Sequence, residues 1–376
     1  MIMKVVDRAM IKNKEKEIKE DRWGDLPTDP LSIIKDRLDF PDNIWFAAVC
    51  RRWHDVSSSY TRIHNSYNPP GIMITRSIYL SKREFISTST GNKYRRTLVD
   101  FCSAKILFSK QGWLLLEDSS TSMSFRDHFG PSVSLLNPFT KTKIELPSRV
   151  ENEPAFARTE FVCGAFTAVD GMPDLVVIVT TLSYKDHEFG QLINVRTVHL
   201  EDNKKDDKWT MHSHIRLPRR SFPVISHVLI VRQLVYCFDE HHNAIVLNLS
   251  NLMWTDLMQH VDNVPYSVME SKGEIYKCGE DTDGRGLVFY KLNANCGVWE
   301  PLEEEDLKDK YCWFVSCPGY TSFLLKQNWS DEVCRGLEGN GYNSAVKVHL
   351  HDAKMTARKF LLDLTEDDSA EWVDMG

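Results

Sequence analysis

Acidic residues suited to calcium binding stand in one short stretch, Asp281-Thr282-Asp283-Gly284. An EF-hand loop beginning at Asp281 needs glycine at its sixth position and a bidentate glutamate at its twelfth. Those positions hold Gly286 and Leu292, so the carboxylate that would close the calcium site is missing. A hairpin turn explains the stretch better, and we expect no metal there.

Two histidine pairs have the spacing with which a zinc site could begin. His349 and His351 flank one residue of an expected strand, so both side chains point to one face. His212 and His214 have the same spacing. A zinc site needs at least three protein ligands, and no third ligand is identifiable near either pair. We expect structural or surface roles for these histidines.

A small basic cluster, Arg216, Arg219 and Arg220, stands beside Pro218. A solvated loop is the simpler interpretation, although such a cluster could also recognise an acidic or phosphorylated segment. The sequence contains no P-loop, no GxSxG and no HExxH motif. We therefore expect no catalytic residues, no cofactor and no metal, and hence a protein that is not an enzyme.

The elements nearest the N-terminus are predicted to be helical, over residues 25–57. Asp29 is a good N-cap and Pro30 fits the first helical position, where its missing N–H costs nothing. The pair Phe40-Pro41 is expected to end this first helix. Apolar residues then recur at helical spacing over Asp42–Val56, which predicts a second helix. The charged residues 1–22 precede this segment and are expected to be flexible.

The pattern changes after about residue 71 to short β-branched and aromatic runs between Gly, Asn and Asp turns. No long amphipathic helix interrupts these runs, so we predict an all-β domain. The expected strands include 112–117, 133–136, 175–180, 234–238, 244–249, 287–292 and 346–350.

A period within this region indicates its architecture. Trp209, Trp254 and Trp299 lie 45 residues apart, each after a strand pair and a turn. Repeats of 40–50 residues with about four strands are typical of propeller blades, and the region has room for about six. We expect the three tryptophans at equivalent, largely buried places in successive blades.

The text WGDLPTDPLSIIKDRLDFPDNIWFAAVCRRWHDV, residues 23–56, resembles an F-box. The matching elements are the Leu-Pro opening, the spaced Ile and Leu, and the Val-Cys-Arg-x-Trp run. Pro30 stands where a second leucine is common, and a helix start tolerates it. This resemblance covers the whole motif.

The second half resembles the plant F-box family whose C-terminal region is a DUF295 or KIB-type β-propeller. The residues that carry this resemblance are SKQGWLLLED at 109–118 and SVSLLNPFTKTKIELP at 132–147. The C-terminal text GNGYNSAVKVHLHD at 339–352 departs from the family pattern, which puts the closure of the last blade in question. The implied chain is multidomain, with a small all-α F-box followed by an all-β propeller. We place a flexible segment at 1–22, the F-box at 23–60, a linker at 61–75 and the propeller at 76–376.

The F-box resemblance implies docking on a Skp-type adaptor and, through it, on a cullin scaffold. A segment of some 40 residues cannot hide all its apolar side chains in a core of its own, which agrees with that role. The candidate adaptor-binding residues are Leu26, Pro27, Leu31, Ile34, Leu38, Val49, Cys50 and Trp53. Which of them face inward is open at this point. The alternative is a helical hairpin packed on the β domain.

The resemblance further implies a substrate-recognition subunit of an SCF-type ubiquitin ligase, which presents an unknown protein substrate on its propeller. The alternative is a propeller scaffold that is not coupled to ubiquitination. A net charge of −7 would repel nucleic acid and anionic membranes, so we expect neither as a partner. Nine cysteines without a CxxC pair predict reduced thiols and a cytoplasmic or nuclear location.

Overall fold

The structure is a computed structural model. Its described residues are 23, 26–35, 37–38, 40–64, 71–75, 82–87, 92–98, 104–118, 132–147, 159–169, 171–183, 191–200, 208–216, 225–239, 243–257, 266–271, 273–280, 287–294, 296–302, 312–316, 323–325, 343–350, 357–362 and 369–373. The chain divides into two compact units, Met1–Ser66 and Tyr67–Gly376. No helix among the described residues is long and apolar enough to cross a bilayer. The segment 1–22, which we expected to be flexible, lies outside these ranges.

The first unit contains three helices, α2 (Thr28–Lys35), α3 (Phe40–Ala47) and α4 (Arg51–His64). The prediction of one helix over Asp42–Val56 is wrong, because the chain turns between Ala47 and Arg51. On a single straight helix, positions seven residues apart would be separated by roughly 10 Å. The turn instead brings the rings of Phe46 and Trp53 to 4.5 Å between centroids, so both can share one core.

Two elements run across the expected boundaries. Helix α4 continues to His64, past residue 60. Strand β1 (Gly71–Thr75), within the expected linker 61–75, pairs with two other strands. The division between the two units falls at Ser66 and Tyr67.

The described strands of the second unit form six four-stranded sheets. Four of these sheets are antiparallel meanders in sequence order. The first holds β4 (Ala104–Lys110), β5 (Trp113–Asp118), β6 (Ser132–Leu136) and β7 (Lys143–Glu145). The second holds β8 (Thr159–Val169), β9 (Met172–Ser183), β10 (Gln191–His199) and β11 (Thr210–Arg216). The third holds β12 (Ile225–Val231), β13 (Leu234–Asp239), β14 (Ala244–Asn248) and β15 (Met253–Leu257), and the fourth holds β16 (Tyr266–Ser271), β17 (Glu274–Glu280), β18 (Leu287–Asn293) and β19 (Val298–Pro301).

The two remaining sheets depart from simple sequence order. One has the order β21-β20-β22-β23, with β20 (Cys312–Ser316), β21 (Phe323–Leu325), β22 (Asn343–Leu350) and β23 (Ala357–Leu362). The other has the order β24-β1-β2-β3, with β24 (Ser369–Val373), β2 (Lys82–Ile86) and β3 (Lys93–Thr97). The last strand of the chain therefore completes the sheet that the first strand begins.

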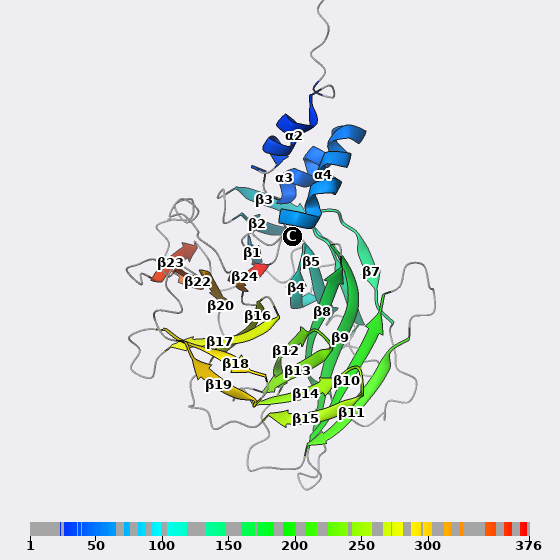
Figure 1. The fold of residues 1–376 in the computed structure, drawn as a ribbon, viewed down its shortest axis with the longest axis vertical. Coiled ribbons are helices and arrows are strands. Elements are labelled where there is room, and N and C mark those ends of the chain that lie inside the picture. The colour runs from blue at the N-terminus through cyan, green and yellow to red at the C-terminus, as the bar shows by residue number, and fades with distance from the viewer. Residues whose placement is uncertain are drawn as a thin grey trace, which may run out of the picture. The chain divides into compact units, whose positions relative to one another are not determined.

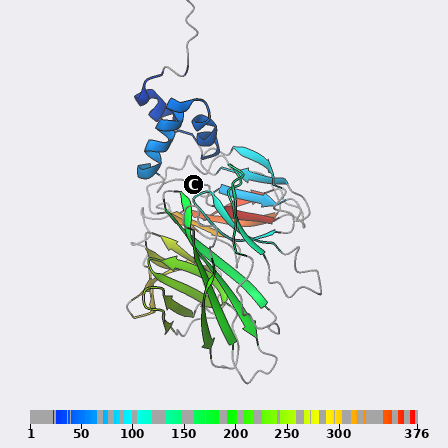
Figure 2. The same cartoon turned by 90° about the vertical axis from the view of Figure 1, so that its right-hand side faces the viewer.

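The sheets are arranged around a common centre (Figure 1). Strand β4 contacts β8, β8 contacts β12, β12 contacts β16, and β16 contacts β21, so the innermost strands of successive sheets are neighbours. Figure 2 shows the same sheets from the side, where the long green strands belong to the sheet β8–β11. This radial repetition of four-stranded antiparallel sheets is the predicted propeller architecture.

The hydrophobic core lies between neighbouring sheets. One cluster joins the sheets β4–β7 and β8–β11 through Leu115, Leu135 and Val176. Comparable clusters join β8–β11 to β12–β15, and β12–β15 to β16–β19. Phe108 on the innermost strand β4 packs against all three clusters. A register shift between Ile106 and Phe108, of the kind that re-aims side chains, precedes it.

The three periodic tryptophans occupy equivalent places at the start of a sheet's outermost strand. Trp254 stands opposite Leu247, and Trp299 stands opposite Leu292. Trp209 immediately precedes β11. Trp299 is buried, and Trp209 and Trp254 are partly buried and pack against the core, which agrees with largely buried places.

Candidate functional site

The helical unit has a small core. Leu31 of α2, Phe46 of α3 and Val56 of α4 are buried, and each helix supplies one of the three. Leu26, Ile34, Leu38 and Trp53 are partly buried and pack against this core. Among the described side chains of the unit, Leu31, Phe46 and Val56 form the buried hydrophobic cluster, while other large apolar side chains stay exposed.

The opening of the unit is tied to its last helix. The indole Nε1 of Trp53 donates a hydrogen bond to the carbonyl oxygen of Trp23, at 3.1 Å. The backbone N–H of Leu26 donates to the same oxygen, at 3.4 Å. Trp53 therefore holds the start of the unit in place, and its side chain is partly buried.

Four large apolar side chains are exposed among the described residues of this unit. They are Trp23 (68% exposed), Ile33 (56%), Trp45 (61%) and Val49 (53%). Trp45 and Val49 stand four positions apart, on the same side of α3 and its exit turn. Contiguous exposed apolar surface marks sites that bind other proteins, so these four side chains are candidates for such a site.

The candidate adaptor-binding residues fall into three groups. Leu31 is fully buried in the core, and its contact with an adaptor stays a prediction. Leu26, Ile34, Leu38 and Trp53 are partly buried supports of the core, and Cys50 is half-buried. Pro27 and Val49 are exposed.

Sequence reasoning missed three exposed residues, Trp23, Ile33 and Trp45. The sequence carries a signal for two of these residues. Ile33 and Trp45 each stand next to a core residue in the sequence, and neither belongs to the stripe that Leu31, Ile34 and Phe46 form. An apolar residue off the buried stripe of an amphipathic helix is the signal for a second, exposed face.

Two of the other residues considered for chemistry, His212 and His214, lie on β11. No group of three His, Cys, Asp or Glu residues in the described part of the chain could hold a metal ion. The hydroxyl of Thr197 lies 3.4 Å from His212 Nε2, and burial lowers the pKa of His212. His214 stacks on Trp254 with 4.9 Å between ring centroids and lies 3.7 Å from a carboxylate oxygen of Asp256. The possible calcium stretch 281–286, together with His351, Arg219 and Arg220, lies outside the described residues.

Comparison with known proteins agrees with both units. The family model described as KIB1-4 beta-propeller matches residues 78–340, and the F-box domain model matches residues 23–64. An F-box/kelch-repeat protein of Arabidopsis thaliana, At1g57790, is 25% identical over 78% of this chain and 76% of its own length. The Arabidopsis F-box protein At4g00893 is 22% identical over 82% of this chain and 74% of its own length.

A third relative matches over a shorter stretch. The Arabidopsis F-box protein At1g49360 is 27% identical over 40% of this chain, and the match spans 30% of that relative's length. The match to the KIB1-4 beta-propeller model, over residues 78–340, covers more than half of this protein's chain. This chain belongs to the KIB1-4 β-propeller family and carries an F-box domain ahead of its propeller.

Proposed function

We propose that this chain is a substrate-recognition subunit of an SCF-type ubiquitin ligase. Its F-box would dock on a Skp-type adaptor, which links it to a cullin scaffold, and its propeller would hold a protein substrate. The observation that carries this proposal is the set of exposed apolar side chains on the F-box, Trp23, Ile33, Trp45 and Val49. The similarity to plant F-box proteins supports it.

The role requires no catalytic residue of this chain. A receptor subunit accelerates ubiquitin transfer by holding the substrate close to the charged conjugating enzyme. The gain comes from effective concentration and orientation, with no acid–base step on the receptor itself. We therefore propose a non-catalytic function.

The adaptor contact can be tested on the exposed residues without disturbing the core. A double Ile33→Ser, Trp45→Ser variant should weaken binding of a purified plant Skp-type adaptor by roughly a thousandfold. The estimate takes about 2 kcal/mol for each large interface side chain and assumes that the two effects add. Calorimetry on the full-length chain measures the affinity, and circular dichroism on the same sample reports the helices.

Met253→Ser is the matched control, because Met253 is 63% exposed but lies in the propeller. It should leave adaptor affinity unchanged. A Leu26→Ala, Trp53→Ala variant should instead lose helical signal together with binding, since both residues support the core. Unchanged affinity in the Ile33, Trp45 variant would reject this surface. Failure of the intact chain to bind any Skp-type adaptor would reject the ligase role.

The alternative is a propeller scaffold that is not coupled to ubiquitination. Affinity purification under proteasome inhibition separates the two functions, using the intact chain and a chain that lacks residues 23–64. A receptor subunit recovers the adaptor and the cullin only with the F-box present. A scaffold recovers the same partners from both chains.

We also propose that the protein works in the cytoplasm or the nucleus. The described cysteines Cys50, Cys163, Cys237 and Cys296 are free thiols, which supports a reducing compartment. Burial raises the pKa of Cys163 to about 11, so this thiol stays protonated and unreactive. Imaging of a fluorescent fusion tests the location, and a secreted fusion would contradict it.

A further inference from the structure

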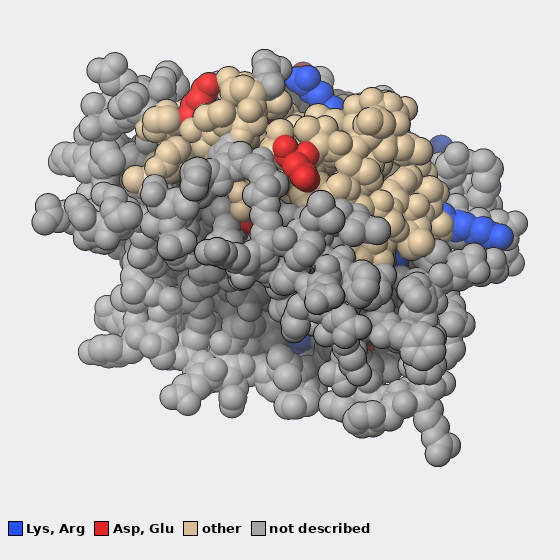
Figure 3. Space-filling view, turned by 90° about the horizontal axis from the view of Figure 1, so that it is seen from below, with Lys and Arg blue, Asp and Glu red and all other residues tan. Residues whose placement is uncertain are grey.

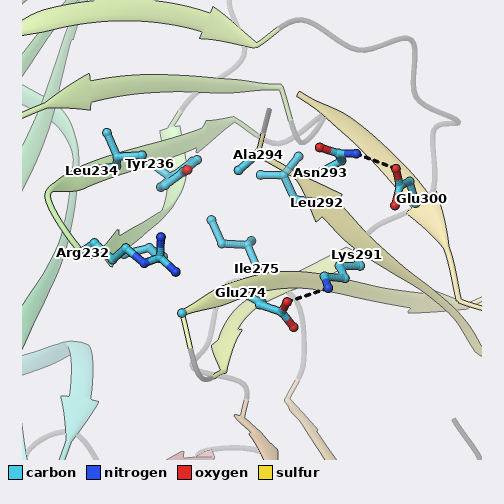
Figure 4. Close-up of a pocket in the computed structure, with 12 residues that line it drawn as sticks. Arg232, Leu234, Tyr236, Glu274, Ile275, Lys291, Leu292, Asn293, Ala294 and Glu300 are labelled. Atoms are coloured by element: carbon cyan, nitrogen blue, oxygen red, sulfur yellow. Dashed lines mark hydrogen bonds and ion pairs between the residues drawn. The ribbon is translucent and has the colours of Figure 1, made fainter. Parts of the chain in front are cut away.

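A cavity of about 430 Å³ lies between the sheet β12–β15 and the sheet β16–β19 (Figure 4). Its walls come from the β12–β13 turn, from the start of β17 and from the end of β18. In an antiparallel meander, the connection between the first two strands and the connection between the last two strands lie at the same end of the sheet. The cavity therefore opens at the end of the propeller where the short turns gather.

The floor of the cavity is apolar. Leu234, Ile275 and Leu292 line it, and Ile275 and Leu292 also belong to the core between the two sheets. A cavity of this volume, with apolar residues beside charged and polar ones, has room for a side chain of a bound segment.

The acidic groups that line the cavity have hydrogen-bond partners in the protein. Glu274 accepts a hydrogen bond from Lys291 at 2.6 Å and another from the hydroxyl of Tyr276 at 2.6 Å. Glu300 accepts a hydrogen bond from the amide of Asn293 at 2.7 Å. Figure 4 shows both contacts, Glu274–Lys291 and Glu300–Asn293, along one side of the cavity. A cationic ligand could therefore pair with Glu274 or Glu300 only by displacing one of these partners.

Two donors of the opposite wall have no such partner. Arg232 is exposed, and neither its guanidinium nor the hydroxyl of Tyr236 bonds to an acceptor among the described residues. Figure 4 shows both side chains extending from the same wall toward the middle of the cavity. Burial raises the pKa of Tyr236 and the charge of Arg232 lowers it, which places the two groups near each other. A guanidinium beside a phenol hydroxyl is a suitable pair of donors for one carboxylate.

The backbone at Arg232 has the geometry of a two-residue hairpin loop between β12 and β13. Its φ is +58°, and Gln111 at the same place in the β4–β5 loop has φ +49°. The tight loop places the Arg232 side chain at the wall of the cavity.

Exposed apolar residues surround the same end of the propeller. Val169 and Met172 flank the β8–β9 turn, Leu252 and Met253 flank the β14–β15 turn, and Val298 follows the β18–β19 turn. Each is more than half exposed. The view from below in Figure 3 shows the outer edge of the sheets, where single acidic and basic side chains stand among other residues of the described surface. This apolar surface is wider than the cavity, so it suits a chain segment better than a small molecule.

We propose that the cavity between the sheets β12–β15 and β16–β19 anchors an extended segment of a protein substrate. The segment places an apolar side chain on the floor formed by Leu234, Ile275 and Leu292, and an Asp or Glu carboxylate beside Arg232 and Tyr236. This inference rests on the proposed substrate-receptor function and names the class of sequence that the receptor recognises.

The test begins with selection of a random peptide library, displayed on phage, on the immobilised full-length chain. Enriched peptides should share a large apolar residue within a few positions of an Asp or Glu. Fluorescence anisotropy with a labelled enriched peptide then measures affinity for the wild type and for variants. Arg232→Gln should weaken binding by about ten- to a hundredfold, the usual worth of a charge-assisted hydrogen bond, and Tyr236→Phe by several-fold.

The matched control is Lys141→Gln. Lys141 is an exposed cation with φ +61° in the β6–β7 turn, so it shares the charge, exposure and backbone geometry of Arg232 but lies in another sheet. Its replacement should leave peptide affinity unchanged. A peptide whose Asp or Glu is changed to Asn or Gln should bind weakly and should no longer distinguish Arg232→Gln from the wild type.

The outcomes separate this inference from the proposed function, because adaptor binding is measured independently on the same preparations. Equal peptide affinity for the wild type and Arg232→Gln would overturn the inference, as would enrichment of peptides that lack a carboxylate or of no peptide at all. In each of these cases intact adaptor binding would leave the receptor function standing. Loss of adaptor binding with normal peptide binding would reject the ligase role and keep the anchoring cavity.

Discussion

His227 is a polar residue on an innermost strand whose burial affects the stability of the protein in acid. It lies on β12, next to a register shift between Ile225 and His227. Its Nδ1 lies 2.9 Å from the hydroxyl of Ser226, while its Nε2 is buried without a hydrogen-bond partner among the described residues. Burial lowers the pKa of His227 from 6.5 to about 4. The folded protein therefore keeps this ring neutral at neutral pH.

The consequence is a loss of stability in mild acid. The unfolded chain binds the proton near pH 6.5 and the folded chain only near pH 4, so protonation favours unfolding. The free energy of unfolding is therefore highest, as far as His227 is concerned, above pH 6.5, and it decreases as the pH falls from there toward 4. At about 1.4 kcal/mol per pH unit, the full loss amounts to about 3 kcal/mol.

A His227→Phe variant should remove this part of the pH dependence. Denaturant unfolding at several pH values between 7 and 4 measures the free energy of unfolding for both proteins. His199→Asn is the control, because His199 is an exposed histidine at the end of β10. If the His227→Phe protein loses as much stability in acid as the wild type does, burial of this ring is not the cause.

At the scale of the elements, the outermost strands tie each sheet to the one before it. Trp299 on β19 contacts Phe238 of the preceding sheet, with 6.1 Å between ring centroids. Trp254 on β15 stacks on His214 of β11. The indole of Trp209 donates a hydrogen bond to the carbonyl oxygen of Pro147, just after β7, at 2.6 Å. The period of 45 residues thus marks a recurring contact between sheets.

The three tryptophans should differ in their contributions to stability. Trp299 is 8% exposed and packs in the core, so Trp299→Ala should cost about 3–5 kcal/mol. Trp254 is only partly buried, and Trp254→Ala should cost clearly less, about 1–2 kcal/mol. Denaturant unfolding of the two variants under identical conditions gives the comparison. Equal costs would mean that burial does not set the contribution of these residues.

The hairpins between the third and fourth strands of the sheets explain why the repeating architecture could be predicted from the sequence. Asn137, Asn248 and Asn293 each end or follow a third strand, and each carbonyl accepts a hydrogen bond from the N–H four residues later. Those later residues, Lys141, Leu252 and Gly297, all have positive φ. The Leu-Asn text and the following turn therefore recur because the same hairpin recurs, and the periodicity of the sequence reflects it.

Other features of the molecule leave no such pattern in the sequence. The break between α3 and α4 depends on the contact of Phe46 with Trp53, which forms only in the folded unit. The cavity beside Arg232 depends on residues from two sheets, from Val231 to Glu300, which become neighbours only when the sheets pack. Helical periodicity predicted the buried stripe of the F-box, but the burial of Leu31 and the exposure of Trp45 are properties of the packed unit.

At the scale of the whole molecule, closure of the propeller depends on the last strand. Strand β24 pairs with β1 in an antiparallel register that runs from Gly71 opposite Val373 to Thr75 opposite Ser369. It also contacts β20 and β22 of the neighbouring sheet. The family match ends at residue 340, so this closing strand lies beyond it. The departure of the C-terminal text from the family pattern does not prevent the pairing.

Removal of β24 should therefore open the ring at a defined place. Truncation after Asp368 removes five registered pairs, each worth about 0.2–1 kcal/mol, which predicts a loss of roughly 1–5 kcal/mol. The truncation also leaves the N–H and C=O groups of β1 as an unpaired edge, and such edges promote association between chains. The variant should melt at a lower temperature than the intact chain and should form oligomers in a concentration-dependent way, as measured by light scattering. Truncation after Val373 is the control, since it keeps β24 and should change neither property. A ring that melts and scatters light identically after both truncations would show that β24 does not close the propeller.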